Sequence, residues 1–432
     1  FVKLDFASQN KEDYMKKALS ILLAMGMTVG MVAGCGDTAD NSSAADNSAA
    51  ASTEADTDGT QAAASAADIK VGVIYIGDEN EGYTAAHMAG IDEMAANLGL
   101  SDDQIIEKTT IPEDESCYDA AVDLADQGCN IIFATSFGHE TYILQAAQEY
   151  PDIQFCHATG YQAASSGLSN MHNYFDAIYE ARYVSGVVAG MKLNEMIENG
   201  DITADQAKIG YVGAFPYAEV ISGFTSFYLG AKSVCESVTM EVQYTNSWAD
   251  MTAEGEVANQ LIADNCVLIS QHADTTGAPS ACETAGVPCV GYNVDMTSVA
   301  PDAALTSPTN NWGVYYTYAV QCVLDGKAID TDWCKGFSED AVRITPVNEA
   351  VAAEGTDAKV EEVEAALKDG SLHVFDTSKF TVNGSSLEDL IAEGGDYAKY
   401  ADYVSDGYYH ESELASAPSF DIIIDGITSQ AN

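Results

Sequence analysis

The chain has 432 residues, with 17 Lys and Arg against 67 Asp and Glu, so its formal net charge is -50 at pH 7. The length allows two or three domains with a large core. The charge argues against nucleic acid or other polyanions as partners, because phosphate would be repelled. A neutral or cationic small molecule suits it better, and a solvated exported surface is the simplest source of the charge.

The first 67 residues read as export and anchoring signals. Residues 1–14 precede the first Met. Codons for the Lys-Glu-Asp of KEDYM can contain a purine-rich ribosome-binding sequence, so we interpret residues 1–14 as translated leader DNA. Residues 15–34 have the basic, apolar and small-residue regions of a signal peptide, and the apolar run is too short for a membrane span. The segment ends in a lipobox-like VAGC that predicts lipidation of Cys35, with an ordinary signal peptide as the alternative. Residues 35–67 lack aromatics and nearly all large aliphatics, which predicts a flexible tether.

From Lys70 onward, apolar strand patterns alternate with helical patterns. This order predicts a parallel sheet with helices on both faces. Strands are expected at residues 70–76, 105–111, 130–136 and 153–160, and helices at residues 85–98, 117–128 and 139–150.

The same rhythm begins again near residue 180. Two successive α/β halves of similar plan predict two lobes with a ligand cleft between them. Helices are expected at residues 180–200, 218–234, 250–265 and 279–286, and strands at residues 208–215, 239–248, 266–274 and 287–296.

Ligands of parallel sheets bind outside the carboxyl ends of the strands, so the residues after each strand are the first candidates for a site. Most are aromatic or neutral and polar, with few carboxylates, which suits a flat, uncharged ligand that forms hydrogen bonds. These residues are Asn80, Tyr83, Ser136, Phe137, Tyr174, Phe175, Phe215, Pro216, Trp248, His272, Asp274 and Asp295.

The sequence carries no signature of catalysis. It has no GxSxG, Walker loop, HExxH or CxxC motif, and its histidines form no close-spaced pair for a metal. Asp274 and Asp295 are candidates for an acid–base pair, but a role as hydrogen-bond acceptors is favoured. The ten cysteines are scattered and are interpreted as small buried hydrophobes, with a disulfide left open. We therefore expect no catalytic residue, no metal and no cofactor.

Several stretches, in order over about residues 70–320, resemble substrate-binding lipoproteins of the basic membrane protein family, which includes purine nucleoside receptors of ABC transporters. Among them are KVGVIYIGDENEGYTAAHMAG, KIGYVGAFPYAEVISGFTSFYLGAKSV, QHADTT, GYNVDM and LTSPTNNWGVYY. The resemblance implies a type I periplasmic-binding fold, in which each lobe is a doubly wound parallel sheet and the ligand cleft lies between the lobes. It also implies that an aromatic ring in the first turn stacks on a purine base. Tyr83 occupies that place, with a core or cleft-wall tyrosine as the alternative.

The chain departs from the family pattern at three positions. Asn80 stands where many members have Asp, and Thr84 where they have Asn, although Asn80 is kept as a ligand candidate. Trp312 stands where nucleoside receptors carry a lysine near the ribose. The chain is more similar to a branch thought to bind a free base such as adenine. The base site is thus expected to be retained, and the departures weaken the case for a ribose site.

The resemblance also implies roles for the remaining site candidates. Trp248 and Trp312 are expected to contact the ligand, with a plug at the lobe interface as the alternative for each. Phe137 and Tyr174 are expected to wall the cleft. Glu219 begins a helix, where the helix dipole alone favours a carboxylate, so ligand-binding and structural roles both stay open.

These features predict a lipoprotein that captures a purine nucleobase or nucleoside, adenine-like by preference, and delivers it to the permease and ATPase of an ABC importer. The lipid at Cys35 would hold it at the outer face of a bacterial cytoplasmic membrane. A sugar or sugar-like signal ligand is the alternative within the binding class. A surface nucleoside hydrolase that uses Asp274 or Asp295 is the enzyme alternative, disfavoured because no nucleophile or metal motif supports it.

Lobe 1 is expected to comprise residues 68–175 and 293–330, and lobe 2 residues 176–292 and 331–432 with a C-terminal extension. Within the extension, residues 357–375 are interpreted as a helix and a strand that close lobe 2. The Tyr-rich segment 397–420 is expected either to pack on lobe 2 or to meet the permease.

Overall fold

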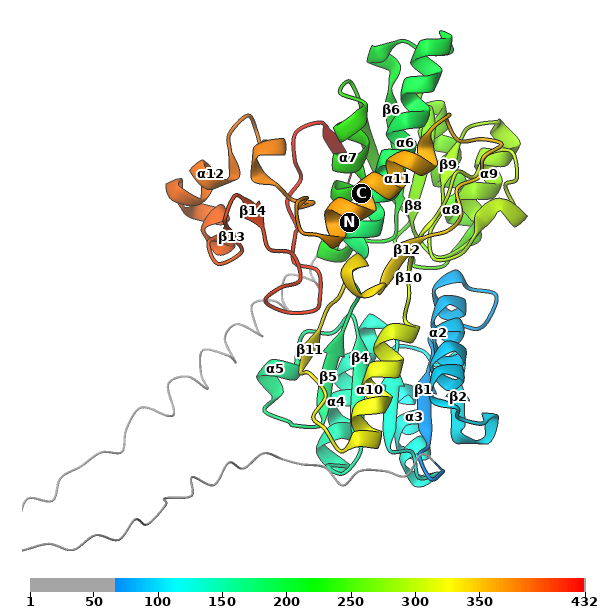
Figure 1. Ribbon diagram of the computed structural model, residues 1–432, viewed down its shortest axis with the longest axis vertical. Helices are drawn as coiled ribbons and strands as arrows, with labels where there is room; N and C mark the ends of the chain where they lie inside the picture. Colours follow the sequence, from blue (N-terminus) through cyan, green and yellow to red (C-terminus); the bar gives the residue numbers. More distant parts are fainter. Residues whose placement is uncertain (1–66, 431–432) are drawn as a thin grey trace, which may run out of the picture. The chain divides into compact units, whose positions relative to one another are not determined.

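Figure 1 shows the computed structural model, which describes residues 67–430. The expected leader, the signal peptide with Cys35, and all but the last residue of the tether lie outside these residues. Among the described helices, none is both long and apolar enough to cross a membrane.

The first sheet has six strands in the order β11-β5-β4-β3-β1-β2, and every pairing is parallel. Strands β1, β3, β4 and β5 are buried along their whole length because helices cover the sheet. The strands are β1 (Val71–Ile74), β2 (Ile105–Lys108), β3 (Ile131–Ala134), β4 (Gln154–Ala158), β5 (Met171–Tyr174) and β11 (Asp332–Trp333). Their helices are α2 (Gly82–Leu98), α3 (Glu115–Asp126), α4 (Glu140–Glu149), α5 (Ala163–Ser166) and α10 (Gly313–Asp325).

The second sheet has five strands in the order β15-β7-β6-β8-β9, again all parallel. The strands are β6 (Lys208–Gly213), β7 (Thr239–Tyr244), β8 (Leu268–His272), β9 (Cys289–Val290) and β15 (Ile427–Gln430). The helices of this part are α6 (Ile178–Asn199), α7 (Ala218–Val234), α8 (Met251–Ala263), α9 (Gly277–Ala285) and α11 (Thr356–Lys368). The two-lobed α/β fold predicted from the sequence is confirmed.

Short segments connect the two sheets (Figure 1). The chain leaves the first sheet after β5, returns to it after β10 (Pro308–Asn310), and leaves again between β11 and β12 (Val342–Ile344). Strands β10 and β12 pair with each other in an antiparallel ladder. Because β11 pairs with β5, it belongs to the first sheet, although the predicted boundary placed it in lobe 2. The first lobe therefore includes β11, and the other predicted lobe boundaries remain predictions.

The C-terminal extension differs from the expectation. Helix α11 forms as predicted, but the strand expected just before residue 375 is wrong, since this segment forms turns and one isolated bridge at Asp376. Strand β15, which the sequence did not predict, pairs with β7 at the edge of the second sheet. Between them lie α12 (Leu387–Glu393), β13 (Val404–Ser405) and β14 (Tyr408–Tyr409). Phe375 stacks on Phe420 with ring centroids 4.5 Å apart, so aromatic packing holds the extension together.

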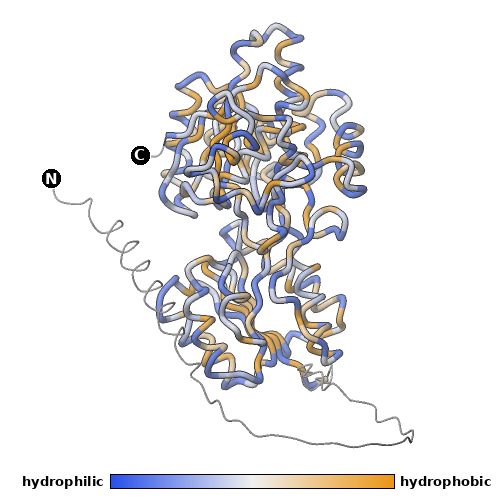
Figure 2. The backbone as a smooth tube through the Cα atoms, turned by 90° about the vertical axis from the view of Figure 1, so that its left-hand side faces the viewer, coloured by the Kyte–Doolittle hydropathy of each residue, from blue (hydrophilic) through white to orange (hydrophobic). Residues whose placement is uncertain are grey.

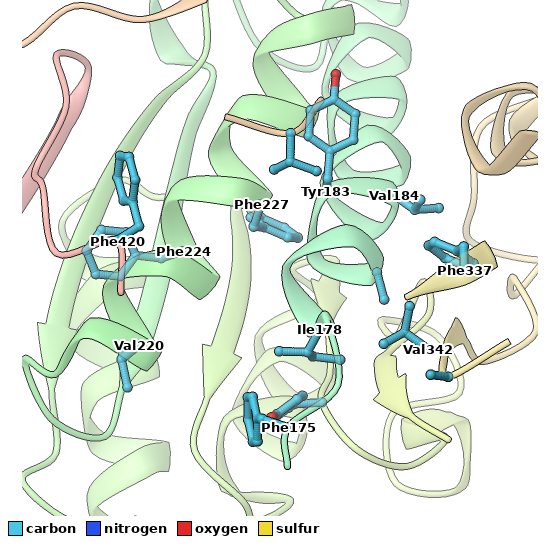
Figure 3. Packing of buried hydrophobic residues seen from close by; sticks show 14 of the residues in the cluster. Phe175, Ile178, Tyr183, Val184, Val220, Phe224, Phe227, Phe337, Val342 and Phe420 are labelled. Atoms are coloured by element: carbon cyan, nitrogen blue, oxygen red, sulfur yellow. The ribbon is translucent and has the colours of Figure 1, made fainter. Parts of the chain in front are cut away.

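The largest group of buried apolar residues includes side chains from both sheets and from α6 and α7. Figure 2 shows apolar residues on the inner strands and polar residues on the outer loops. Figure 3 shows part of this group, with Ile178, Tyr183 and Val184 on α6 and Val220, Phe224 and Phe227 on α7. The nine cysteines among the described residues are all free and eight are buried, as expected for small hydrophobes.

Candidate functional site

A cavity of about 140 Å³ lies at the carboxyl ends of strands from both sheets. An apolar cavity of about 150 Å³ has room for benzene. This cavity is therefore on the scale of one small flat molecule and not of a peptide or an oligosaccharide. It is lined by Ile76, Gly77, Glu81, Tyr83, Thr135, Ser136, Phe137, Thr159, Glu219, Trp248, Ala249, Asp274 and Tyr292.

Tyr83 is held in the wall of the cavity by its position in the first turn of α2. The Glu81 carboxylate caps this helix, accepting hydrogen bonds from the backbone N–H groups of Tyr83 at 2.6 Å and Thr84 at 2.9 Å. The Tyr83 hydroxyl donates to the carbonyl oxygen of Thr135 at 2.6 Å. The backbone and the hydroxyl of Tyr83 are thus both held, which presents the ring to a ligand at little cost in conformational entropy.

Three other aromatic side chains line the cavity. Phe137 lies in the turn after β3, Trp248 follows β7, and Tyr292 follows β9. Trp248 packs against Phe215 with ring centroids 5.4 Å apart. Aromatic rings therefore enter the cavity from both lobes, which favours a planar ligand.

Asp274 contributes a carboxylate just after β8. Its Oδ1 accepts a hydrogen bond from Asn293 Nδ2 at 2.8 Å, and its backbone N–H donates to the Trp248 carbonyl at 2.8 Å. The Gly82 N–H donates to the Asp274 carbonyl at 3.1 Å, which joins the two lobes beside the cavity. Burial, then the nearby carboxylates of Glu81, Glu254 and Glu219, raise the pKa of Asp274 well above its usual value.

Glu219 contributes a second carboxylate, from the first turn of α7. Burial raises its pKa to about 7, although the positive charge of Arg182 acts in the opposite direction. Glu219 Oε1 lies 3.4 Å from His272 Nε2. Burial and then Arg182 lower the pKa of His272 well below its usual value, so this imidazole is neutral at physiological pH.

Arg182 lies behind the wall of the cavity. Its Nη1 donates to the Tyr211 hydroxyl at 2.9 Å and to the Gln271 carbonyl at 2.6 Å, and the guanidinium lies 3.8 Å from the Tyr292 ring centroid. The side chain is fully buried, and no ion pair to a carboxylate forms within the described residues. Arg182 thus places a positive charge near Glu219 without reaching the ligand space.

Five of the predicted site residues lie together in the cavity wall: Tyr83, Phe137, Trp248, Asp274 and Glu219. The other four do not line it, and two of these are exposed. The Asn80 amide and backbone N–H both donate to Asp78 Oδ1 at 3.0 Å in a turn, and Asp295 accepts from the Thr297 N–H at 2.9 Å as a helix cap. The Asn80 side chain therefore bonds a neighbouring side chain, and the Asp295 side chain satisfies a local backbone group.

The other two candidates that do not line the cavity are core residues. Tyr174 is fully buried, with its ring stacked on Tyr315 at 3.9 Å and its hydroxyl 3.1 Å from the Tyr316 hydroxyl. Trp312 is also fully buried and stacks on His87 at 4.2 Å. Tyr174, expected to wall the cleft, and Trp312, expected to contact the ligand or to plug the lobe interface, instead pack α10 against the rest of the first lobe.

Sequence reasoning missed Glu81, Thr159 and Tyr292 as parts of the lining. Thr159 directly follows β4 and Tyr292 follows β9, so the strand-end rule applied to every strand would have found both. Thr159 also has a backbone φ of 65°, which is rare for a β-branched residue and is typical of functional sites. Glu81 had no signal beyond its position before a helix.

Groups of three or more His, Cys, Asp or Glu side chains that could hold a metal ion do not occur within residues 67–430. The arrangement is that of a small binding cavity, with rings for packing and carboxylates for polar contacts.

Comparison with known proteins identifies the family. The model of PnrA-like ABC transporter substrate-binding proteins, the Bmp family, matches residues 68–372. The chain is 33% identical to a purine-binding protein of Brucella abortus (strain 2308), over 73% of this chain and 85% of that one. It is 36% identical to a putative ABC transporter glucose-binding protein of Haloferax volcanii, over 46% of each chain.

A solved structure supports the fold. A solute-binding protein of an ABC transporter system from Aeropyrum pernix K1 superposes with a TM-score of 0.58, at 17% identity, over 75% of this chain and 96% of that one. The family model spans every strand from β1 to β12 and every helix from α2 to α11. The chain therefore belongs to the Bmp family of PnrA-like ABC transporter substrate-binding proteins.

Proposed function

We propose that the protein captures a free purine, adenine-like by preference, or its nucleoside in this cavity and delivers it to the permease and ATPase of an ABC importer. The observation that carries the proposal is the composition of the wall: four aromatic side chains and the carboxylates of Asp274 and Glu219 surround about 140 Å³. A purine offers a flat ring face to the aromatics and N–H groups to the carboxylates.

The energies of these contacts suit a transport receptor. Stacking of a base on an aromatic side chain contributes about 1–3 kcal/mol. A hydrogen bond to a charged group adds about 1.5–3 kcal/mol. A ligand without N–H donors would leave buried carboxylates unpaired, and this penalty supplies the specificity.

The name of the Brucella abortus relative supports a purine ligand. The predicted lipid anchor at Cys35, which lies outside the described residues, would keep the protein beside its permease at the outer face of the membrane. Nucleic acid is not among the proposed partners, because the net charge of -50 opposes it.

A sugar is the second candidate, favoured by the name of the Haloferax volcanii relative. Rings and carboxylates also bind hydroxyl-rich molecules. Isothermal titration calorimetry of the purified protein with adenine, adenosine and glucose separates the two candidates. We expect the purine to bind and glucose not to bind; glucose binding without purine binding would contradict the proposal.

We expect adenine affinity to rise as the pH increases from 6 to 8. Ligand N–H groups prefer the ionised Glu219 carboxylate, and its pKa of about 7 means that at lower pH it must lose a proton before it accepts their hydrogen bonds. The expected gain is roughly tenfold, since each pH unit below the pKa costs about a factor of ten. Calorimetry at pH 6, 7 and 8 measures it.

The variant Glu219→Gln is the control for this pH dependence. The titratable and charged groups near Glu219 are His272, Arg182, Asp274, Tyr83 and Tyr292. The lowered pKa of His272 keeps its imidazole neutral throughout this pH range, and burial raises the pKa of the Tyr83 and Tyr292 hydroxyls, which stay neutral as well. We expect nearly constant affinity in Glu219→Gln; an unchanged rise with pH would assign the titration to Asp274 and refute the role of Glu219.

A further inference from the structure

Exposed aromatic side chains gather at the mouth of the cavity. Phe137, Tyr161 and Tyr217 are 44%, 58% and 47% exposed, and they are the exposed large aromatic residues of the described chain. Phe137 itself lines the cavity, and its ring contacts both Tyr161 and Tyr217. A cluster of exposed apolar side chains at one place indicates a binding or closing role, because scattered single residues would need no explanation.

These rings form a continuous row, which we call the mouth row: Tyr161, Phe137, Tyr217, Phe215 and Trp248. Successive ring centroids are 6.3, 6.1, 5.0 and 5.4 Å apart. All four separations fall in the range of favourable aromatic pairs. The mouth row is therefore a set of mutual contacts and not a chance grouping.

The row crosses from one lobe to the other between Phe137 and Tyr217. Phe137 follows β3 of the first sheet, and Tyr217 caps α7, which follows β6 of the second sheet. Their rings are inclined by 30°, close to parallel. A planar group stacked between two rings lies about 3.5–4.0 Å from each of them. The two rings would therefore have to be roughly 7–8 Å apart to hold it. The 6.1 Å separation leaves no room for one.

We propose that the contact between Phe137 and Tyr217 closes the mouth over the ligand and selects a free base over its nucleoside. This inference rests on the proposed purine function. A cavity of about 140 Å³ is filled by a base, so the ribose of a nucleoside has to leave through the mouth. The ribose then parts the two rings and loses their contact, whereas a free base fits beneath them.

The test compares adenine and adenosine by isothermal titration calorimetry in the purified protein and its variants. Tyr217→Ala is the main variant, because Tyr217 does not line the cavity and its loss removes no direct ligand contact. We expect the wild type to prefer adenine, and the ratio of the two affinities to fall roughly 2- to 13-fold in Tyr217→Ala, as the loss of one aromatic pair implies.

Three further variants sharpen the test. Tyr217→Phe keeps the ring and is expected to keep the wild-type ratio. Leu414→Ala removes another exposed apolar side chain, 57% exposed, from the C-terminal extension, and it is also expected to keep the wild-type ratio. In the double variant of Phe137→Ala with Tyr217→Ala, the ratio of the two affinities is expected to fall by less than the product of the falls in the two single variants. The reason is that both substitutions break the same contact.

The outcomes distinguish the two proposals. If adenine binds but Tyr217→Ala leaves the ratio unchanged, the selection by the mouth row is refuted and the purine function stands. If neither adenine nor adenosine binds the wild type, the purine function is refuted and the selection with it. If wild type binds adenosine as tightly as adenine, the mouth does not exclude ribose and the selection is refuted.

Discussion

Replacing Tyr83 with alanine is expected to weaken adenine binding roughly 5- to 160-fold, the range that follows from the loss of one base–aromatic stacking contact. Tyr83 is the ring that the first turn of α2 places in the cavity wall, and it is held there by Thr135 and by the cap at Glu81. Its removal also enlarges the cavity and admits water to the carboxylates. Calorimetric titration of both proteins at one pH and salt concentration measures the loss.

Tyr83→Phe is the matched control, because it keeps the ring and removes only the hydroxyl that donates to the Thr135 carbonyl. If the ring carries the binding energy, this variant keeps affinity to within a few-fold. Equal losses in Tyr83→Phe and Tyr83→Ala would show that the hydrogen bond to the first lobe matters and that the ring does not. Unchanged affinity in Tyr83→Ala would exclude a contact between Tyr83 and the ligand.

Part of the cavity wall can be predicted from the sequence because ligands of parallel sheets bind outside the carboxyl ends of the strands. The alternation of strands and helices located the strand ends, and Tyr83, Phe137 and Trp248 follow β1, β3 and β7 in the structure. The same rule located Asp274 after β8. No side-chain contact had to be known for these residues.

The remaining candidates lie outside the cavity wall because a strand-end position does not determine where a side chain points. Tyr174 is the last residue of β5, and its ring faces Tyr315 of α10, a helix some 140 positions later in the sequence. Trp312 likewise packs on His87 of α2. Contacts between residues so distant in the chain depend on how the helices pack, which periodicity does not report.

The C-terminal extension shows the same limit for strands. Residues 427–430 are only four in number, and two of them are exposed, so they carry little hydrophobic signal. They form β15 because the edge of β7 is available for parallel pairing. The more apolar segment that ends at residue 375 forms no strand, and the isolated bridge between Asp376 and Tyr408 comes only after it. Strand formation here depends on an available partner more than on composition.

Close packing between helices α6 and α7 supports the site. Gly186 of α6 lies so close to α7 that a Cβ there would be far inside contact distance of the Phe227 carbonyl oxygen. Gly230 of α7 stands in the same relation to the Tyr183 carbonyl of α6. Because α6 begins at a lobe connection and α7 carries Glu219 in its first turn, this close packing positions the cavity carboxylate.

Gly186→Ala is therefore expected to lower the free energy of unfolding by about 3 kcal/mol or more, since a backbone atom cannot move aside as a flexible side chain can. Gly255→Ala is the matched control: it also lies within a helix, α8, but its Cβ would meet nothing closer than 3.5 Å. There the gain in helix propensity should stabilise the protein by up to about 1 kcal/mol. Denaturant unfolding followed by circular dichroism measures both changes. A Gly186→Ala protein that unfolds at the wild-type midpoint would show that α6 and α7 can separate without cost, and Glu219 would then owe its position to contacts other than this helix pair.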